Sequence, residues 1–208
     1  MSGGSIENCR AENGGAVYIL GDSETEFSLS GGTIKNCVSE NGGGAVYLAG
    51  GKVTVSEGAI EGNVARNGNG GGVSILNGNF LMQGGSIIKN SSYAINGSGG
   101  KGGGVYVSST GNVDVDLLSG IIIENTSALL GGGICVEMPS SSTATADIVV
   151  GESGNPTNEY PMVKGNLTLL QGGGLYVSGK RSNMVIHSGT ILDNSTSGYV
   201  ANPNVVNE

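Results

Sequence analysis

Asp114 and Asp116 form the densest acidic group in this sequence and lie two residues apart in an alternating run typical of a strand. Cleavage of a polysaccharide needs two carboxylates, or a carboxylate and a basic residue, that converge on one face. In the repeat described below, no lysine or arginine stands in register beside this pair; the equivalent positions are Ser28, Thr54, Leu81 and Val185. We therefore expect a solvated acidic face or a weak cation site, and we assign no catalytic residue.

The cysteines and the histidine form no metal or nucleophile motif. The chain has three cysteines, Cys9, Cys37 and Cys135, and one histidine, His187. A zinc site or a Cys–His nucleophile pair needs a Cys-x-x-Cys pair or a Cys/His cluster, and the sequence contains neither. We expect no metal site and no cofactor, and an enzyme is disfavoured.

Composition excludes several classes of protein. The net charge is −8 with only nine lysines and arginines, which disfavours nucleic-acid binding because phosphates are neutralised by clustered cations. No apolar run approaches the ~18 residues needed to span a membrane as a helix. Glycine supplies 41 of 208 residues, against a usual share of ~7%. Its spacing is not that of collagen, and its doublets interrupt every stretch that could form a long helix.

The glycines belong to a repeat of about 28 residues with the pattern Gly-x-Ile-x-x-[Asn/Cys]-x-small. Internal repeats of this length indicate a stacked architecture in which each repeat contacts its neighbours. The copies are Gly4-Ile6-Cys9-Ala11, Gly32-Ile34-Cys37-Ser39, Gly58-Ile60-Asn63-Ala65, Gly85-Ile87-Asn90-Ser92, Gly120-Ile122-Asn125-Ser127, a degenerate Pro161-Val163-Asn166-Thr168, and Gly189-Ile191-Asn194-Thr196.

Two further apolar runs with a period of two accompany each copy, so one repeat contains three short strands. Residues 46–48 and 53–55 are examples. Three strands joined by glycine-rich corners make a triangular coil that cannot bury its inner face alone. We predict that residues 1–208 form one all-β domain, a right-handed single-stranded parallel β-helix of about seven coils, roughly 30 Å long at ~4.8 Å per coil.

Asparagine closes the first strand of most copies, and we interpret this column as a structural ladder of stacked amides. Cys9 and Cys37 replace asparagine in the first two copies and should be adjacent and largely buried. Parallel side chains in register make a disulfide awkward, so we favour two packed thiols, and a bridge stays the alternative. Cys135 is expected to face outward. The ladder comprises Asn63, Asn90, Asn125, Asn166 and Asn194, with Cys9 and Cys37 at its start.

The outward side of the second strand carries a column of tyrosines. It reads Tyr18, Tyr47, Ser74, Tyr106, Cys135, Tyr176. Exposed aromatic faces with polar tips suit sugar binding at a wet interface, which makes the four tyrosines a candidate ligand-binding face. The alternative is that tyrosine simply suits a half-exposed strand.

The outward side of the first strand becomes apolar in later copies, and contiguous exposed apolar surface usually has a partner. The candidate interaction patch is Ile88, Ile121, Ile123, Met162 and Leu192. Its partner would be another chain, a neighbouring domain or the two insertions, 137–146 and 151–161, where a repeat scaffold places specificity. Equally open is that Tyr160 and Pro161 fold back over Ile121 and Ile123.

The segments Gly14-Gly15-Ala16-Val17 and Gly43-Gly44-Ala45-Val46, together with the Ile-x-x-Asn pattern, resemble the repeats of polymorphic outer-membrane-protein-type β-helices. That family has Gly-Gly-Ala-Ile/Leu/Val and Phe-x-x-Asn motifs, so this chain differs in carrying Ile for Phe and, in two copies, Cys for Asn. The resemblance covers nearly the whole chain. It implies a non-catalytic rod for adhesion or display on the surface of a bacterium.

We therefore expect an extracellular module belonging to a longer surface protein, with its export signal outside these residues. Its partners would be a host or bacterial surface glycan or protein, or neighbouring domains. The alternative is a carbohydrate-active β-helix, either a glycan-binding module or an enzyme related to polysaccharide lyases and hydrolases.

Overall fold

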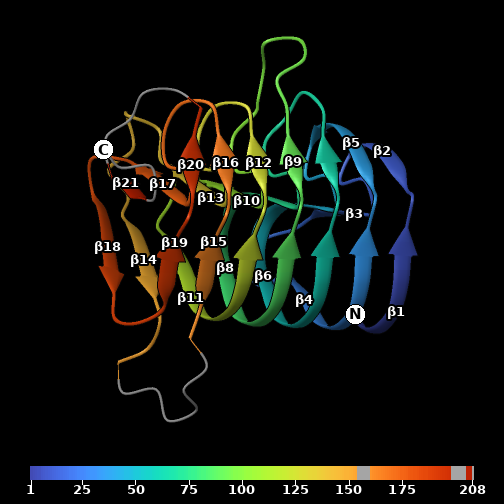
Figure 1. Cartoon of the computed structure of the whole chain (residues 1–208), viewed down its shortest axis with the longest axis horizontal. Coiled ribbons are helices and arrows are strands. Elements are labelled where there is room, and N and C mark those ends of the chain that lie inside the picture. The colour runs from blue at the N-terminus through green and yellow to red at the C-terminus, as the bar shows by residue number, and fades with distance from the viewer. Residues whose placement is uncertain (154–159, 198–204, 208) are drawn as a thin grey trace.

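The computed structural model describes residues 1–153, 160–197 and 205–207, and these residues form an all-β fold without a helix (Figure 1). None of them therefore belongs to a helix long and apolar enough to cross a membrane. Asn155 and Pro156 of the second insertion, and the tail from residue 198 to 204, lie outside the described residues.

The strands form two sheets. The 14-stranded sheet contains β1 (Ser2–Glu7), β3 (Val17–Leu20), β4 (Glu26–Lys35), β6 (Val46–Glu61), β8 (Val73–Ile88), β10 (Val105–Ser108), β11 (Val113–Ile123), β13 (Ile134–Glu137), β14 (Ala146–Val150), β15 (Met162–Lys164), β17 (Leu175–Ser178), β18 (Ser182–Ile186), β19 (Thr190–Leu192) and β21 (Val205–Asn207). The seven-stranded sheet contains β2 (Arg10–Asn13), β5 (Val38–Gly42), β7 (Val64–Ala65), β9 (Ser91–Ser92), β12 (Thr126–Ser127), β16 (Leu167–Thr168) and β20 (Ser195–Thr196).

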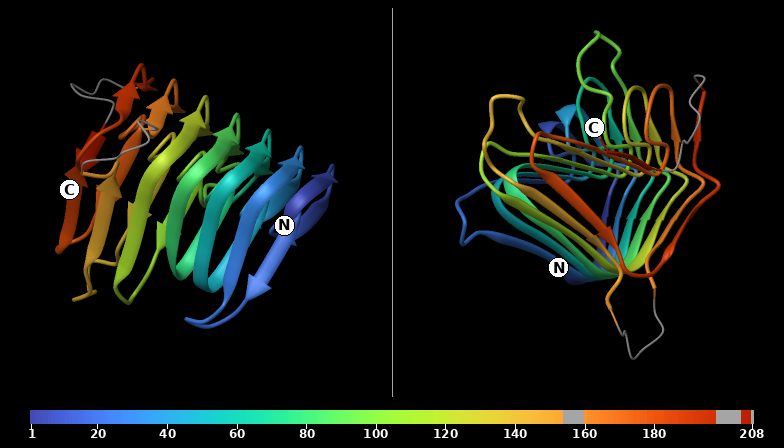
Figure 2. Two further views of the ribbon diagram at one scale, coloured as in Figure 1. Left: turned by 90° about the horizontal axis from the view of Figure 1, so that it is seen from below. Right: turned by 90° about the vertical axis from the view of Figure 1, so that its left-hand side faces the viewer.

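Every strand pair among the described residues is parallel and joins equivalent positions of successive repeats. One column runs through Val17, Val46, Val73, Val105, Ile134 and Leu175. The repeats consequently lie side by side along the long axis, and the view along that axis has a roughly triangular outline (Figure 2). The predicted alignment of the repeats is confirmed.

The number of strands in a repeat differs from the prediction in two ways. In β6 and β8 the three predicted strands are joined into one long strand. The hydrogen bonds between β6 and β8 continue through the bends that separate the predicted strands. A fourth, short strand follows the asparagine or cysteine of each copy and builds the seven-stranded sheet. Most of these strands are two residues long, too short to show an alternation in the sequence.

The inward side chains form one continuous core along the stack. Each repeat contributes the isoleucine or valine of its pattern together with inward residues of the other two strands. The largest fully buried side chains are Phe80, Leu29, Ile34, Leu48, Ile60, Ile75, Met82, Ile87, Leu117, Ile122, Ile134 and Ile148. Each repeat therefore depends on its neighbours to keep this surface from water.

The predicted asparagine ladder is present and buried. Asn90 illustrates it: its Oδ1 accepts from the backbone N–H and from the Nδ2 of Asn63, both at 2.9 Å. Its own Nδ2 donates to the carbonyl of Ile60 at 2.9 Å and to Oδ1 of Asn125 at 3.0 Å. The same arrangement continues through Asn166 to Asn194. Because a buried amide without partners is costly, the ladder stabilises one vertical register.

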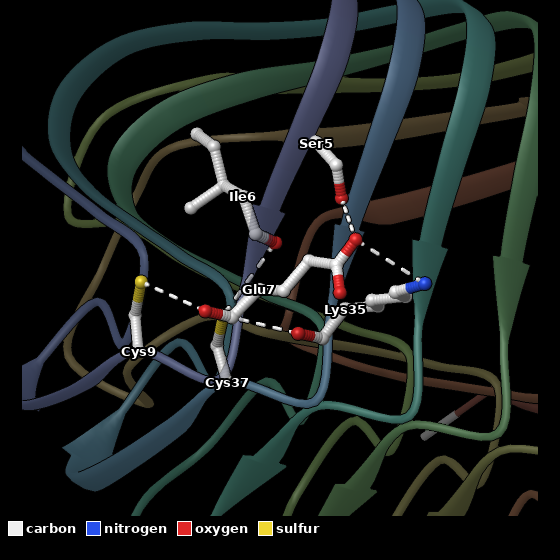
Figure 3. Close-up of polar contacts among 6 residues, drawn as sticks. All are labelled: Ser5, Ile6, Glu7, Cys9, Lys35 and Cys37. Carbon is white, nitrogen blue, oxygen red and sulfur yellow. Dashed lines mark hydrogen bonds and ion pairs between the residues drawn. The ribbon is translucent and has the colours of Figure 1, made fainter.

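Cysteine begins the ladder without a disulfide (Figure 3). The Cys37 thiol lies 3.3 Å from the carbonyl oxygen of Lys35, and the Cys9 thiol lies 3.4 Å from that of Glu7. Cys37 is buried, and its backbone N–H donates to Oδ1 of Asn63 at 2.9 Å. Cys9 is only half-buried, because it lies in the first repeat of the stack. The two side chains are packed thiols, as favoured from the sequence.

The turn before each ladder residue requires a left-handed backbone. The residue at this corner has φ near +60° in every copy, and in three copies it is a bulky or charged residue: Lys89 (φ 56°), Glu124 (φ 56°) and Asp193 (φ 55°). A left-handed conformation costs ~1–2 kcal/mol for such residues. The hydrogen bonds of the adjacent asparagine therefore hold a corner that these residues would not adopt by themselves.

The glycine corner is required by close approach between repeats. Gly102 has a φ of 63°, and a Cβ on Gly103 would overlap the carbonyl oxygen of Gly132 in the next repeat. Only glycine allows the backbones to approach in this way. This confirms the predicted role of the glycine clusters.

Replacing Asn90 with alanine tests the ladder. The variant leaves the Asn63 N–H, one Nδ2 hydrogen of Asn63 and the Ile60 carbonyl without this partner, so we expect a loss of about 3 kcal/mol or more in the free energy of unfolding. Urea denaturation followed by circular dichroism measures it. Asn183→Ala is the matched control, because Asn183 is exposed and its side chain makes only a 3.5 Å hydrogen bond with Asp147. A loss below about 1 kcal/mol for Asn90→Ala would contradict the role given to the ladder.

Candidate ligand-binding site

The tyrosine column exists in the predicted order on one face of the 14-stranded sheet. Strand register places Tyr18, Tyr47, Ser74, Tyr106, Cys135 and Tyr176 at equivalent positions of successive repeats. The rings of Tyr18 and Tyr47 stack, with centroids 5.4 Å apart and planes inclined by 15°. The aromatic ladder is therefore formed at its N-terminal end.

The expectation that all four tyrosines are exposed is wrong. Tyr18 is 54% exposed, whereas Tyr106 and Tyr176 are each only 6% exposed. Leu76 and Leu130 pack against the cluster formed by Tyr106, Cys135 and Tyr176. Lys101, Leu130 and Gln171 each directly precede a glycine triplet. Isolated parallel β-bridges join Lys101 to Leu130 and Leu130 to Gln171. These residues cover the later part of the column.

Cys135, expected to face outward, is completely buried between its two tyrosine neighbours. Burial and, to a smaller extent, the nearby Glu137 raise the pKa of its thiol well above the usual range. A thiol in this environment stays protonated and is a poor nucleophile. Its role is to fill the column.

A charged group lies beside this cluster. The Lys101 ammonium lies 2.7 and 2.8 Å from the two carboxylate oxygens of Glu137, and the Tyr106 hydroxyl donates to Glu137 at 3.0 Å. Burial first, and then the Glu137 charge, raise the pKa of Tyr106 far above its usual value. The three side chains satisfy one another, and the hydroxyl of Tyr106 stays protonated.

A groove opens where the exposed half of the column meets the covered half. This groove, which we call the tyrosine groove, has a volume of about 220 Å³. Ser74, 2% exposed, stands at the position where neighbouring repeats carry tyrosine. The residues that line it are Asn13, Asn41, Gly42, Tyr47, Asn67, Gly68, Asn69, Ser74, Leu76, Gly99 and Tyr106.

The asparagines of the tyrosine groove have unused hydrogen-bonding capacity. Oδ1 of Asn67 accepts from the Asn96 N–H at 2.9 Å, and Oδ1 of Asn69 accepts from the Lys101 N–H at 3.1 Å. Asn41 donates its Nδ2 to Glu12 at 3.2 Å. Within the described part of the chain, the Nδ2 groups of Asn67 and Asn69 and the Oδ1 of Asn41 bond to no protein group. Two donors and an acceptor thus remain for a ligand.

A second groove, of about 580 Å³, lies under the first insertion. The insertion connects β13 to β14 and overhangs the ends of β10, β13 and β17. The groove is lined by Ser108, Glu137, Met138, Pro139, Ser140, Ser178, Gly179 and Lys180. Its carboxylate, Glu137, already contacts Lys101 and Tyr106.

The candidate apolar patch divides into two columns. Ile121 pairs with Met162, and Ile88 pairs with Ile123, but Lys164 separates Ile123 from Leu192. Met162 is 37% exposed and the other four residues are half-buried. The charge of Lys164 therefore interrupts the continuous surface expected from the sequence.

The residues suggested to fold over this patch differ in burial. Pro161 is buried, and its carbonyl accepts from the Thr190 N–H at 2.8 Å, whereas Tyr160 is 46% exposed. Pro161 therefore packs at the base of the second insertion, beside the strand that begins at Met162.

The acidic pair lies on one outward face, as predicted, with Asp114 exposed and Asp116 half-buried. Burial and then the Asp114 charge raise the pKa of Asp116, and Lys52 opposes this shift. Lys52 pairs with Asn79, whose Oδ1 accepts from the Asp114 N–H at 3.0 Å, so a lysine lies nearer than the sequence alignment indicated. Across residues 1–153 and 160–197, no three histidine, cysteine or acidic side chains gather as metal ligands.

The asparagine side of the tyrosine groove was not predicted from the sequence. The spacing of the ladder residues indicates an insertion at this point. Asn90 and Asn125 are 35 positions apart, whereas Asn63 and Asn90 are 27 positions apart. The extra residues form a loop after β9 that rises above the stack (Figure 1) and brings Gly99 to the groove. Ser74 was visible as the first interruption of the tyrosine column.

Comparisons with protein-family models, curated proteins and solved structures gave no match to this chain.

Thiol titration tests the placement of the cysteines. Cys37 and Cys135 are buried, and burial raises the pKa of each, so we expect only Cys9 to react quickly with Ellman's reagent in the folded protein. All three thiols should react after unfolding without a reductant. Fewer than three would reveal a disulfide, and rapid reaction of three thiols in the folded protein would contradict the burial of Cys135.

Proposed function

We propose that the chain is a right-handed single-stranded parallel β-helix of about seven coils that acts as a non-catalytic extracellular surface module, in adhesion or as a rod for display. The observation that carries the fold is the register, because every described strand pairs in parallel with its equivalent one repeat away. Right-handed crossovers predominate between parallel strands in a sheet, which gives the handedness.

The rod-like stack supports a role in attachment. Its core and its asparagine ladder are shared between repeats, so a residue on the surface keeps a fixed position relative to residues several repeats away. The tyrosine groove provides one exposed aromatic surface with free amide groups on this rigid support. We place the module at the surface of a bacterium, as the resemblance of its repeat motifs implies.

A carbohydrate-active role is the second candidate, and the tyrosine groove is the observation that favours its binding form. The enzymatic form has weaker support. Asp114 and Asp116 lie on an open strand surface, and neither groove is lined by them. The two candidate functions are compatible, because an adhesin can attach to a surface by binding a glycan.

Bead attachment tests the proposal. Beads coated with the chain should attach to epithelial cells or to bacterial cells several-fold more than albumin-coated beads do, and Tyr18→Ala/Tyr47→Ala should reduce attachment because it removes the exposed aromatic pair. Tyr160→Ala is the matched control, since Tyr160 is also exposed and lies outside the tyrosine groove. Attachment no greater than that of albumin beads to both cell types would contradict adhesion.

An enzyme assay forms the second arm. The native chain and an Asp114→Ala/Asp116→Ala variant should release no products from a panel of acidic and neutral polysaccharides. Cleavage by the native chain that disappears in the variant would overturn the non-catalytic assignment.

A further inference from the structure

We propose that the tyrosine groove is a binding subsite for one neutral pyranose ring, which occupies the level of Ser74 and stacks on the free face of Tyr47. The inference rests on the proposed adhesive function and specifies the class of ligand. The tyrosine column is interrupted at Ser74 and at Cys135, and only Ser74 lines the groove. Tyr18 and Tyr47 stack with centroids 5.4 Å apart, and the next position in register is the small side chain of Ser74.

The half-buried Tyr47 borders the groove. Tyr18 covers one face, and strand register places Ser74 on the opposite side, where Tyr47 lines the groove. Successive repeats are about 4.8 Å apart, which matches the distance at which rings stack. A ring bound at the level of Ser74 would therefore continue the ladder that Tyr18 and Tyr47 begin.

The far end of the space is closed by protein. Tyr106 occupies the next position of the column after Ser74, and Leu76, which packs against it, also lines the groove. The volume of about 220 Å³ corresponds to about seven water molecules at ~30 Å³ each. The site therefore has room for a single sugar ring and not for an extended chain within the groove.

The polar groups suit hydroxyls. The Nδ2 groups of Asn67 and Asn69 can donate, and Oδ1 of Asn41 can accept, because their other ends are held by Asn96, Lys101 and Glu12. A sugar hydroxyl both donates and accepts, so it can pair with either kind of group. An aromatic face combined with fixed amides is an arrangement that gives a small polar ligand both affinity and orientation.

The charges favour a neutral sugar. The chain carries a net charge of −8. Near the groove, the Glu40 carboxylate lies between Arg10 at 2.6 Å and Arg66 at 3.7 Å, Glu12 accepts from Asn41, and Lys101 is paired with Glu137. Each of these cations already faces a carboxylate, so the groove offers a uronic acid no dedicated partner and the chain as a whole repels it.

Ser74→Tyr provides a sharp test because it restores the residue type of the neighbouring repeats. The new ring would stack on Tyr47 and fill the groove, so binding should be lost while the unfolding midpoint stays unchanged or rises. Tyr47→Ala removes the stacking surface and should weaken binding about tenfold. Tyr160→Ala removes an exposed tyrosine elsewhere and should change binding less than twofold.

The measurement is saturation-transfer NMR on the whole chain, using the methyl glycosides of glucose, galactose, mannose and N-acetylglucosamine, with methyl glucuronide as the charged counterpart. We expect at least one neutral glycoside to bind in the millimolar range, with its ring protons shifted by Tyr47, and the glucuronide to bind more weakly. Absence of binding by all four neutral sugars, stronger binding of the glucuronide, or binding that persists in both Ser74→Tyr and Tyr47→Ala would overturn the proposal.

The outcome is separable from that of the bead assay. Attachment of beads without any glycoside binding would refute the pyranose subsite and leave adhesion to a protein ligand. Glycoside binding without attachment would support the subsite and contradict the adhesive role.

Discussion

Buried side-chain amides set the geometry on which the rest of this molecule depends. Asn90, Asn125 and Asn166 each bond to the asparagines of the repeats before and after them, and their side chains also bond to two backbone groups of the preceding repeat. Such an amide is satisfied in only one vertical alignment. A shift of one residue would also turn the inward side chains of each strand outward. Hydrogen bonding and core packing therefore select the same register, and the left-handed corners at Lys89 and Glu124 are stabilised as a consequence.

Because the register is fixed, a repeat that differs from its neighbours at one position changes the shape of the surface at that position. Because equivalent residues stack, one small residue in a column of large ones produces a recess, and Ser74 has this effect between Tyr47 and Tyr106. Extra residues in a repeat leave the stack unchanged and project from its corners. The loop after β9 borders the tyrosine groove, and the loop after β13 overhangs the larger one. Recognition can therefore vary without disturbing the core.

The sequence predicted what periodicity controls. The positions of the core residues, the asparagine ladder and the order of the tyrosine column all follow from aligning the repeats, because stacking places equal positions together. Periodicity carries no information on what covers a column from outside. Leu76 and Leu130 pack against Tyr106 and Tyr176, and the positions in register with these leucines carry unrelated residues such as Ala49, Ser108, Lys101 and Gln171. Two-residue strands such as Val64–Ala65 are also too short to leave a pattern. The asparagine wall of the groove depends on a loop whose path no alternation specifies.

Distances between spin labels test the stacked register most directly. Residues 35, 61, 88, 123 and 164 form one column, so labels at Lys35→Cys and Lys164→Cys, in a Cys9→Ser background, span four steps of ~4.8 Å. Moving the second label to Leu192→Cys adds one further step. The stacked register predicts narrow distance distributions by pulsed electron paramagnetic resonance, with the second centred about 5 Å beyond the first. A broad distribution, or a second distance equal to or shorter than the first, would contradict the stack.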